Sequence, residues 1–193
     1  MIHMRKEAEK KHFPIMRKSL ACLMDIIIKA TKPRNILEIG TCIGYSSLVM
    51  YKAMGQRGQI STIELDYDLA CQARKYFKMA GADRNIFIYN GDAGEILEYM
   101  DGVFDIIFMD GPKGQYLSYL NHCLRLLRPG GLLVCDDVLF YGMVANDKIV
   151  NKKKDTIVRE MKKFLKIISN HTSLDTIIIP LGDGISISYK KGG

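Results

Sequence analysis

Acidic residues recur in this 193-residue chain at the points where apolar segments end. Glu64 closes the segment ISTIE, Asp110 follows FDIIFM, and Asp136 and Asp137 follow LLVC. Because the carboxyl ends of parallel strands meet at one edge of a sheet, we expect Asp110, Asp136 and Asp137 to form an oxygen-rich cluster. Carboxylates so close together are costly unless a cation neutralises them, and oxygen ligands favour Mg²⁺. The three aspartates are therefore predicted metal ligands, with helix or loop capping as the alternative role of each acid.

A glycine turn joins an apolar segment to a helical one at NILEIGTCIGYSS, where Gly40 and Gly44 bracket the turn. A strand that leads into a helix through such a turn presents backbone N–H groups at the helix N-terminus, which suits an anionic ligand group. Glu64 lies at the spacing expected of a carboxylate that binds ribose hydroxyls, and Asp92 suits the adenine side of a nucleoside. The pattern predicts a nucleoside-bearing cofactor.

The residues of the turn discriminate between cofactors. A dinucleotide fingerprint needs a second glycine where this chain has Cys42, and no Gly-Lys-Ser/Thr follows to make a P-loop. Glu38, inside the preceding strand, would repel a pyrophosphate but could receive an ammonium group. These features fit S-adenosylmethionine, whose amino-acid end carries a carboxylate and an ammonium. The alternative is that the glycines only serve the first turn of a βαβ unit.

Lys113 lies just past Asp110, in the segment GPKGQY. A lysine beside a metal-bound substrate oxygen can act as a general base, because neighbouring cations lower its pKa. The alternative role of Lys113 is a surface or phosphate contact. Tyr116 would either pack against the substrate or anchor its own helix.

A regular alternation of strands and helices positions these residues. Strands are predicted at 35–40, 59–64, 85–89, 104–109 and 132–136, and helices at 15–30, 45–54, 67–80, 115–127 and 154–170. A turn is predicted at Arg128-Pro129-Gly130-Gly131, and TIIIP and ISISYK predict a hairpin around an Asp-Gly turn. Because parallel strands need crossover helices, we expect an α/β, doubly wound, Rossmann-like fold with helices on both faces. Its sheet would be seven-stranded and mostly parallel, with a C-terminal antiparallel hairpin.

The length suits one domain spanning residues 1–193, with residues 1–32 as an N-terminal helical cap. No apolar run reaches about 18 residues, so no membrane span is expected. The N-terminus lacks an apolar signal core, so we expect a cytoplasmic protein. The five cysteines include no Cys-x-x-Cys pair, which predicts buried free thiols in a reducing cytosol.

The net charge of +7 is concentrated in two regions. Residues 1–18 hold six Lys or Arg against two acids, and residues 148–166 hold eight against two. Such a basic excess predicts an anionic partner, nucleic acid first, with a solvated helix face as the alternative.

The segments LEIGTCIGYSS, STIELD, FMDGPKGQY, LLVCDDVLFYG and IIPLGDGISISYK cover nearly the whole chain. Together they resemble the cation-dependent O-methyltransferases of the catechol and caffeoyl-CoA type. KKHFPIM, Lys-Gly-Gln-Tyr and the short N-terminal region are most similar to the bacterial tRNA 5-hydroxyuridine methyltransferase branch. That branch methylates the 5-hydroxyl of a wobble uridine in the anticodon.

The resemblance implies a set of site residues. The implied S-adenosylmethionine contacts are Glu38, Gly40, Thr41, Gly44, Tyr45, Ser46, Glu64, Leu65, Asp92, Ala93 and Asp110. The implied catalytic residues are Lys113, as the base, and Asp110, which with Asp136 and Asp137 would also bind Mg²⁺ or another divalent cation. Asp137 stands where the family usually has Asn. A third carboxylate would tighten Mg²⁺ while making a bound hydroxyl harder to ionise.

The expected reaction is methyl transfer to the 5-hydroxyl of 5-hydroxyuridine in a tRNA anticodon loop, held by the basic N-terminal and 148–166 regions. A small-molecule catechol O-methyltransferase is the first alternative. A nicotinamide oxidoreductase is disfavoured by Cys42, and an idle RNA-binding module would have no reason to assemble the three aspartates. No membrane partner is expected. Relatives are often dimers, so a homodimer is a further expectation.

Overall fold

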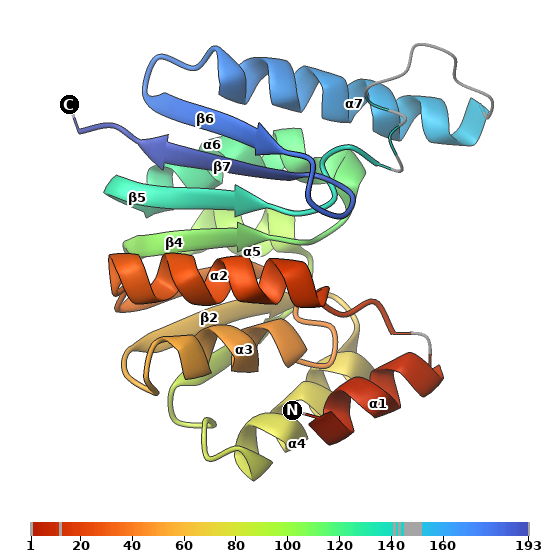
Figure 1. The fold of residues 1–193 in the computed structure, drawn as a ribbon, viewed down its shortest axis with the longest axis vertical. Helices are drawn as coiled ribbons and strands as arrows, with labels where there is room; N and C mark the ends of the chain where they lie inside the picture. Colours follow the sequence, from red (N-terminus) through yellow and green to blue (C-terminus); the bar gives the residue numbers. More distant parts are fainter. Residues whose placement is uncertain (1, 12, 141, 143, 145–151, 193) are drawn as a thin grey trace. The chain divides into compact units, whose positions relative to one another are not determined.

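The computed structural model describes residues 2–11, 13–140, 142, 144 and 152–192 (Figure 1). The chain packs into two compact units, residues 1–96 and 97–193. The start of the predicted basic region at 148–166 lies outside the described residues. That residues 1–193 act as one domain stays a prediction.

The first unit is built on three parallel strands in the order β3-β2-β1. These are β1 (Asn35–Ile39), β2 (Gln59–Glu64) and β3 (Ile86–Asn90). The helices are α1 (Ile2–Lys11), α2 (Lys18–Thr31), α3 (Tyr45–Ala53) and α4 (Tyr67–Met79), and α5 (Ala93–Tyr99) crosses into the second unit. Four of the five residues of β1 are buried, as expected of a parallel strand covered on both faces.

The second unit holds four strands in the order β4-β5-β7-β6. β4 (Phe104–Met109) pairs in parallel with β5 (Leu127–Cys135), and the hairpin of β6 (Leu174–Ile179) and β7 (Ile185–Lys190) pairs antiparallel with β5. The helices are the 3₁₀ turn η1 (Lys113–Gln115), α6 (Tyr116–Leu126) and α7 (Lys152–Ser169), and α7 lies over β6 in Figure 1. The structure confirms the predicted mostly parallel α/β fold and its C-terminal antiparallel hairpin.

The predicted turn at residues 128–131 is wrong. β5 begins at Leu127, five residues before the predicted start, and the register against β4 steps from Phe104↔Leu127 to Ile106↔Leu132. Residues 128–131 form an irregular part of β5 that has no paired residues in β4. Gly130 permits this irregularity, because its φ of 76° lies in the left-handed region that glycine adopts easily. At Gly131 a Cβ would lie 2.8 Å from the carbonyl oxygen of Asp105, so the two backbones approach too closely for a side chain.

Two predictions from composition can be compared with the described residues. All five cysteines are free, but only Cys123 and Cys135 are buried and Cys22 is exposed, so the prediction of buried thiols holds for two of them. Within the described ranges, no helix is long and apolar enough to cross a membrane.

Candidate functional site

The three predicted metal ligands lie together at the end of two paired strands in the second unit. β4 and β5 run in parallel with Met109 opposite Cys135, so Asp110 and Asp136 follow at the same level. Oxygen atoms of Asp110, Asp136 and Asp137 lie within 4.8 Å of one another. The backbone N–H of Asp137 donates to Oδ1 of Asp136 over 2.8 Å, which links the two neighbouring aspartates directly. The expected convergence of the aspartates is thus present.

The electrostatics of this acidic triad (Asp110, Asp136 and Asp137) fit a cation. Asp136 is buried, and this burial, with the nearby charges of Asp110 and Asp137, raises its pKa to about 7. An ordinary aspartate titrates near pH 4, so the ionised triad is unfavourable without a positive charge beside it. Three carboxylate oxygens suit a hard divalent cation such as Mg²⁺.

Lys113 supplies positive charge to the triad from η1. Its Nζ lies 2.8 Å from Oδ1 of Asp110 and 3.6 Å from Oδ2 of Asp137. Burial lowers the pKa of Lys113, but the charge and hydrogen bond of Asp110 and the charges of Asp137 and Asp136 outweigh it, so the pKa is raised. A general base needs the opposite shift, because it must lose its proton near neutral pH. The protein's own groups therefore hold Lys113 as a cation, and its role as base stays a prediction.

Tyr116 connects Lys113 to the backbone at the ends of β4 and β5. Its ring is fully buried and packs edge to face on Phe164 of α7, with 5.6 Å between the ring centroids. Its hydroxyl lies 3.0 Å from the carbonyl oxygen of Met109 and 3.1 Å from that of Asp136, and it accepts from Nζ of Lys113 over 3.0 Å. Of the two roles predicted for Tyr116, the structure supports the anchor, because a fully buried ring has no surface for a substrate.

The predicted cofactor turn lies in the first unit, between β1 and α3. Gly40 and Gly44 have φ values of 102° and 82°, which favour glycine. A Cβ at Gly44 would lie 2.4 Å from Cε1 of Phe77 on α4, so this glycine also permits close packing of the turn on α4. Cys42 adopts a φ of 49°, and its N–H donates to Oε2 of Glu64 over 2.7 Å. The end of β2 therefore holds the turn in place.

Glu38 lies beneath this turn with no exposed surface. Its Oε2 accepts hydrogen bonds from Oγ1 of Thr62 on β2, at 2.6 Å, and from the hydroxyl of Ser47 on α3. The hydroxyls of Thr62 and Thr41 lie 2.6 Å apart. Since Thr62 donates to Glu38, Thr41 donates to Thr62. In this structure Glu38 ties β1 to β2 and α3, and its contact with a cofactor ammonium stays a prediction.

The other predicted cofactor contacts differ in their exposure and in the hydrogen bonds that they already make within the protein. Glu64 also accepts from the N–H of Asp66, over 2.9 Å. Oδ1 of Asp92 accepts from the N–H groups of Gly94, at 2.7 Å, and of Glu95, at 3.2 Å, so Asp92 caps α5. The side chain of Leu65 is 68% exposed. The remaining predicted contacts of the first unit are buried or nearly so: Thr41, Tyr45, Ser46 and Ala93.

Three contacts near the turn were missed by the sequence interpretation. Thr62 and Ser47 are the hydroxyl partners of Glu38, and the signal for Thr62 was a polar residue in the middle of an apolar strand. Arg5 of α1 is the third: its Nη2 donates to the Tyr45 hydroxyl over 2.8 Å and to the carbonyl oxygen of Met16 over 3.0 Å. Nothing in the sequence pairs Arg5 with Tyr45, 40 positions away.

The predicted basic region is described only in part. On α7, Arg159, Lys163 and Lys166 are exposed, whereas Val158, Met161 and other apolar side chains of the helix are buried. Glu160 pairs with Arg159 at 3.8 Å and with Lys163 at 2.9 Å. The described part of α7 is thus an amphipathic helix with a basic outer face, and its binding to RNA stays a prediction.

Comparisons with known proteins identify the family of this chain. A family model for O-methyltransferases matches residues 1–191. The catechol O-methyltransferase of Niastella koreensis is 32% identical over 177 residues, which cover 87% of this chain and 78% of that protein. A Staphylococcus aureus protein provisionally described as a caffeoyl-CoA O-methyltransferase has a TM-score of 0.90 at 28% identity, over 97% of this chain and 90% of that one. For the SAH-bound methyltransferase PaMTH1 of Podospora anserina the TM-score is 0.86 at 26% identity, over 96% and 86%. The chain therefore belongs to the O-methyltransferase family.

Proposed function

We propose that this protein transfers the methyl group of S-adenosylmethionine to a hydroxyl oxygen, with Mg²⁺ or another divalent cation held by the acidic triad. The observation that carries the proposal is the convergence of three carboxylates within 4.8 Å in a chain of the O-methyltransferase family. A divalent cation supplies a Lewis acid that lowers the pKa of an acceptor hydroxyl and orients it. S-adenosylmethionine supplies the electrophilic methyl group.

The residues of the first unit would bind the methyl donor. The turn between Gly40 and Gly44 would place backbone N–H groups near its carboxylate. Glu64 would accept from ribose hydroxyls while it still holds the N–H of Cys42, since each carboxylate oxygen can accept more than one hydrogen bond. SAH in the solved structure of PaMTH1 supports this assignment by similarity.

Lys113 would accept the proton of the acceptor at its Nζ. Its raised pKa comes from three carboxylates, whose effect exceeds the lowering caused by burial. With the charges of Asp110, Asp136 and Asp137 neutralised by a bound cation, burial would be the dominant influence on Lys113 and would lower its pKa. Tyr116 keeps Nζ beside the triad through its 3.0 Å hydrogen bond. The same lysine would thus be a cation without metal and a base with it.

A small molecule with adjacent hydroxyls, as in a catechol, is the acceptor best supported by similarity. The Niastella koreensis relative is a catechol O-methyltransferase, and other relatives are described as caffeoyl-CoA O-methyltransferases. The second candidate is 5-hydroxyuridine at the wobble position of tRNA. It is favoured by the exposed basic face of α7, formed by Arg159, Lys163 and Lys166, which a small acceptor would not need.

The test is methyl transfer from labelled S-adenosylmethionine with Mg²⁺ or with EDTA. A catechol and tRNA from cells that lack this protein are offered in parallel. We expect Mg²⁺-dependent labelling that Asp110→Asn abolishes and Asp175→Asn preserves, because Asp175 is an exposed aspartate on β6, outside the triad. Labelling of both acceptors in EDTA would refute the metal site. Labelling of tRNA alone, weakened by Arg159→Gln with Lys163→Gln, would select the second candidate.

A further inference from the structure

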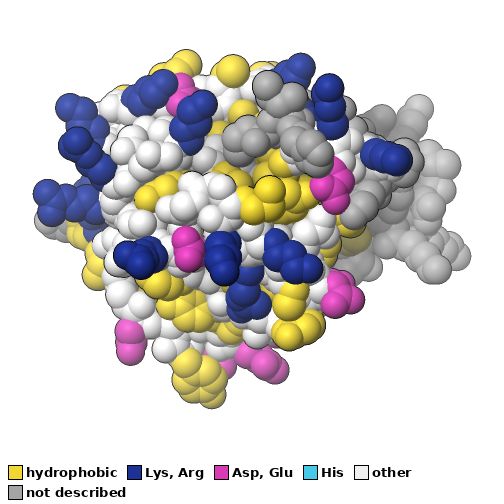
Figure 2. Space-filling view, turned by 90° about the horizontal axis from the view of Figure 1, so that it is seen from below, with side chains coloured by type: hydrophobic (Ala, Val, Ile, Leu, Met, Phe, Trp, Pro, Cys, Tyr) yellow, Lys and Arg dark blue, Asp and Glu magenta, His cyan; other side chains and the backbone are white. Residues whose placement is uncertain are grey.

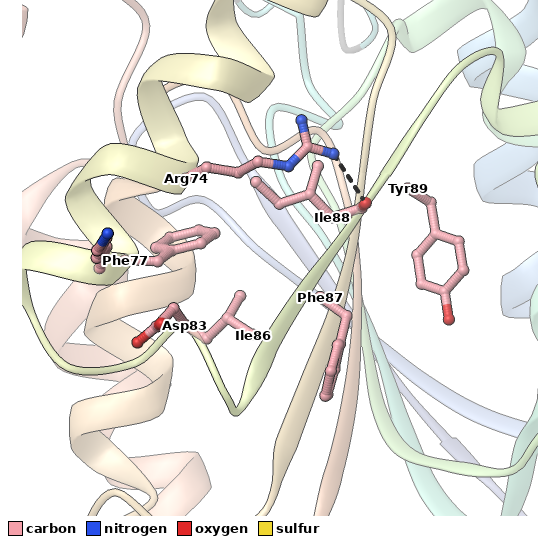
Figure 3. Close-up of a pocket in the computed structure, with 8 residues that line it drawn as sticks. Arg74, Phe77, Asp83, Ile86, Phe87, Ile88 and Tyr89 are labelled. Atoms are coloured by element: carbon pink, nitrogen blue, oxygen red, sulfur yellow. Dashed lines mark hydrogen bonds between the residues drawn. The ribbon is translucent and has the colours of Figure 1, made fainter.

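A groove of about 560 Å³ lies in the first unit between α4 and β3 (Figure 3). Phe77 and Ile86 form its apolar floor, and both are buried. Arg74 and Lys78 reach it from α4 and are exposed. Its volume is within the range of sites that bind small organic groups.

Two aromatic side chains stand on the strand that borders this groove. Phe87 and Tyr89 are 42% and 44% exposed, and Figure 3 shows both projecting from the side of β3 away from Phe77. Residues two apart on a strand share one face and lie about 6.6 Å apart. β3 is the outer strand of its sheet, where exposed aromatic surface is a liability unless a partner covers it. Two flat apolar surfaces are therefore presented side by side.

The surroundings of the groove are strongly basic. Residues 74–84 contain four Lys or Arg, all exposed, and a single acid, Asp83. Figure 2 views the molecule from below and shows Lys and Arg side chains interspersed with exposed hydrophobic side chains and some Asp or Glu. The groove is thus suited to a partner that is both anionic and aromatic.

The edge of β3 is poorly suited to a protein strand. Nη2 of Arg74 donates to the carbonyl oxygen of Ile88, at 3.4 Å, so a side chain occupies the position where a further strand would donate. An acidic peptide would satisfy the cations but would leave the faces of Phe87 and Tyr89 without flat partners. Bases of a single-stranded nucleic acid stack on such faces while Lys and Arg contact the phosphates.

We propose that single-stranded RNA binds across the outer edge of β3, with phosphates at Arg74 and Lys78 on the α4 side and bases on Phe87 and Tyr89, which project from the other side of the strand. This inference goes beyond the proposed methyl transfer and does not depend on which acceptor is correct. An RNA that carries no methyl acceptor would bind equally well, so binding can be measured without catalysis.

The experiment measures fluorescence anisotropy of a labelled oligouridylate of about 12 nucleotides, within the usual site size of such grooves, with the full chain. We expect Phe87→Leu with Tyr89→Leu to weaken binding about thirtyfold or more, because the stacking of two bases is lost. Leucine keeps the strand apolar, and circular dichroism checks the fold. Tyr99→Leu, at an aromatic residue that is 80% exposed outside the groove, is the matched control and should bind as the parent does.

The basic side of the groove is tested by salt dependence. Arg74→Gln with Lys78→Gln should reduce the slope of log K against log salt by about 1.4, which is about 0.7 for each lost phosphate contact. Lys29→Gln with Lys52→Gln removes the same charge from other exposed positions of the first unit and should leave the slope unchanged. This variant pair decides the matter even where the leucine variant fails to fold. The proposal is overturned by an absence of binding at low salt, by equal effects in variant and control, or by equal binding of polyglutamate.

Discussion

Replacing Thr62 with valine removes one hydroxyl from the buried network beneath the cofactor turn while preserving the shape of the side chain. The hydroxyl of Thr62 donates to Glu38 over 2.6 Å and lies 2.6 Å from the hydroxyl of Thr41. A hydrogen bond to a charged group contributes about 1.5–3 kcal/mol and one between neutral groups about 0.5–1.5 kcal/mol. Thr41 can rotate toward another acceptor, so we expect Thr62→Val to lower the free energy of unfolding by about 2–4 kcal/mol.

Denaturant titration followed by circular dichroism measures this free energy, and a loss of that size also lowers Tm by roughly 4–16 °C in a chain of this length. Thr62→Ser keeps the hydroxyl and loses only a buried methyl, so it should retain most of the stability. The comparison isolates the hydrogen bonds from the packing. Equal stability of the valine and serine variants would show that the network contributes nothing, and the reading of Glu38 as a tie between β1, β2 and α3 would be wrong.

Three further predictions follow from the two sites. In EDTA the free energy of unfolding should fall as pH rises from about 4 to 7, by at most about 4 kcal/mol. The reason is that Asp136 has a pKa of about 7 in the folded protein and therefore keeps its proton at a pH where the unfolded chain has already lost it. Thermal melts of Asp136→Asn should show no such fall in stability. Gly44→Ala should destabilise by about 1–3 kcal/mol more than Gly55→Ala in thermal melts, since both have positive φ but only Gly44 has a neighbour within 4 Å of a Cβ. Tyr116→Phe should lower kcat while changing KM much less, because Lys113 loses the 3.0 Å hydrogen bond that positions it. Proportionate changes in kcat and KM would contradict this.

Much of the fold and the positions of the acids could be predicted from the sequence because both depend on local pattern. A short apolar run bounded by a glycine turn defined β1, and the carboxyl ends of parallel strands share an edge, so Asp110 and Asp136 had to follow at the same level. The start of β5 was missed because Pro129, Gly130 and Gly131 resemble an ordinary turn. Only the pairing of Leu127 with Phe104 shows that the strand has already begun, and that pairing is a long-range contact.

The roles of individual side chains were harder to predict, because they depend on contacts between distant segments. Glu38 was assigned to an ammonium on the basis of its charge, yet its position opposite Thr62 in the β1–β2 register gives it a buried structural partner. Tyr116 had two open roles until its ring was found against Phe164, 48 positions later. Local sequence identifies which residues have reactive or hydrogen-bonding side chains. Burial and contacts with distant segments decide whether those side chains are free to meet a ligand or are already bonded within the protein.

Asp137 illustrates how backbone and charge act separately at one position. Its φ of 55° lies in the left-handed region, which Asn and Asp tolerate better than other residues with side chains. The conformation therefore accounts for a choice between Asn and Asp at this position without reference to a metal. Charge separates the two: Asp137 contributes to the raised pKa of both Asp136 and Lys113, and an asparagine would not. The third carboxylate thus makes the ionised triad less favourable and holds Lys113 more firmly as a cation. Both effects increase the change that a divalent cation would cause on binding.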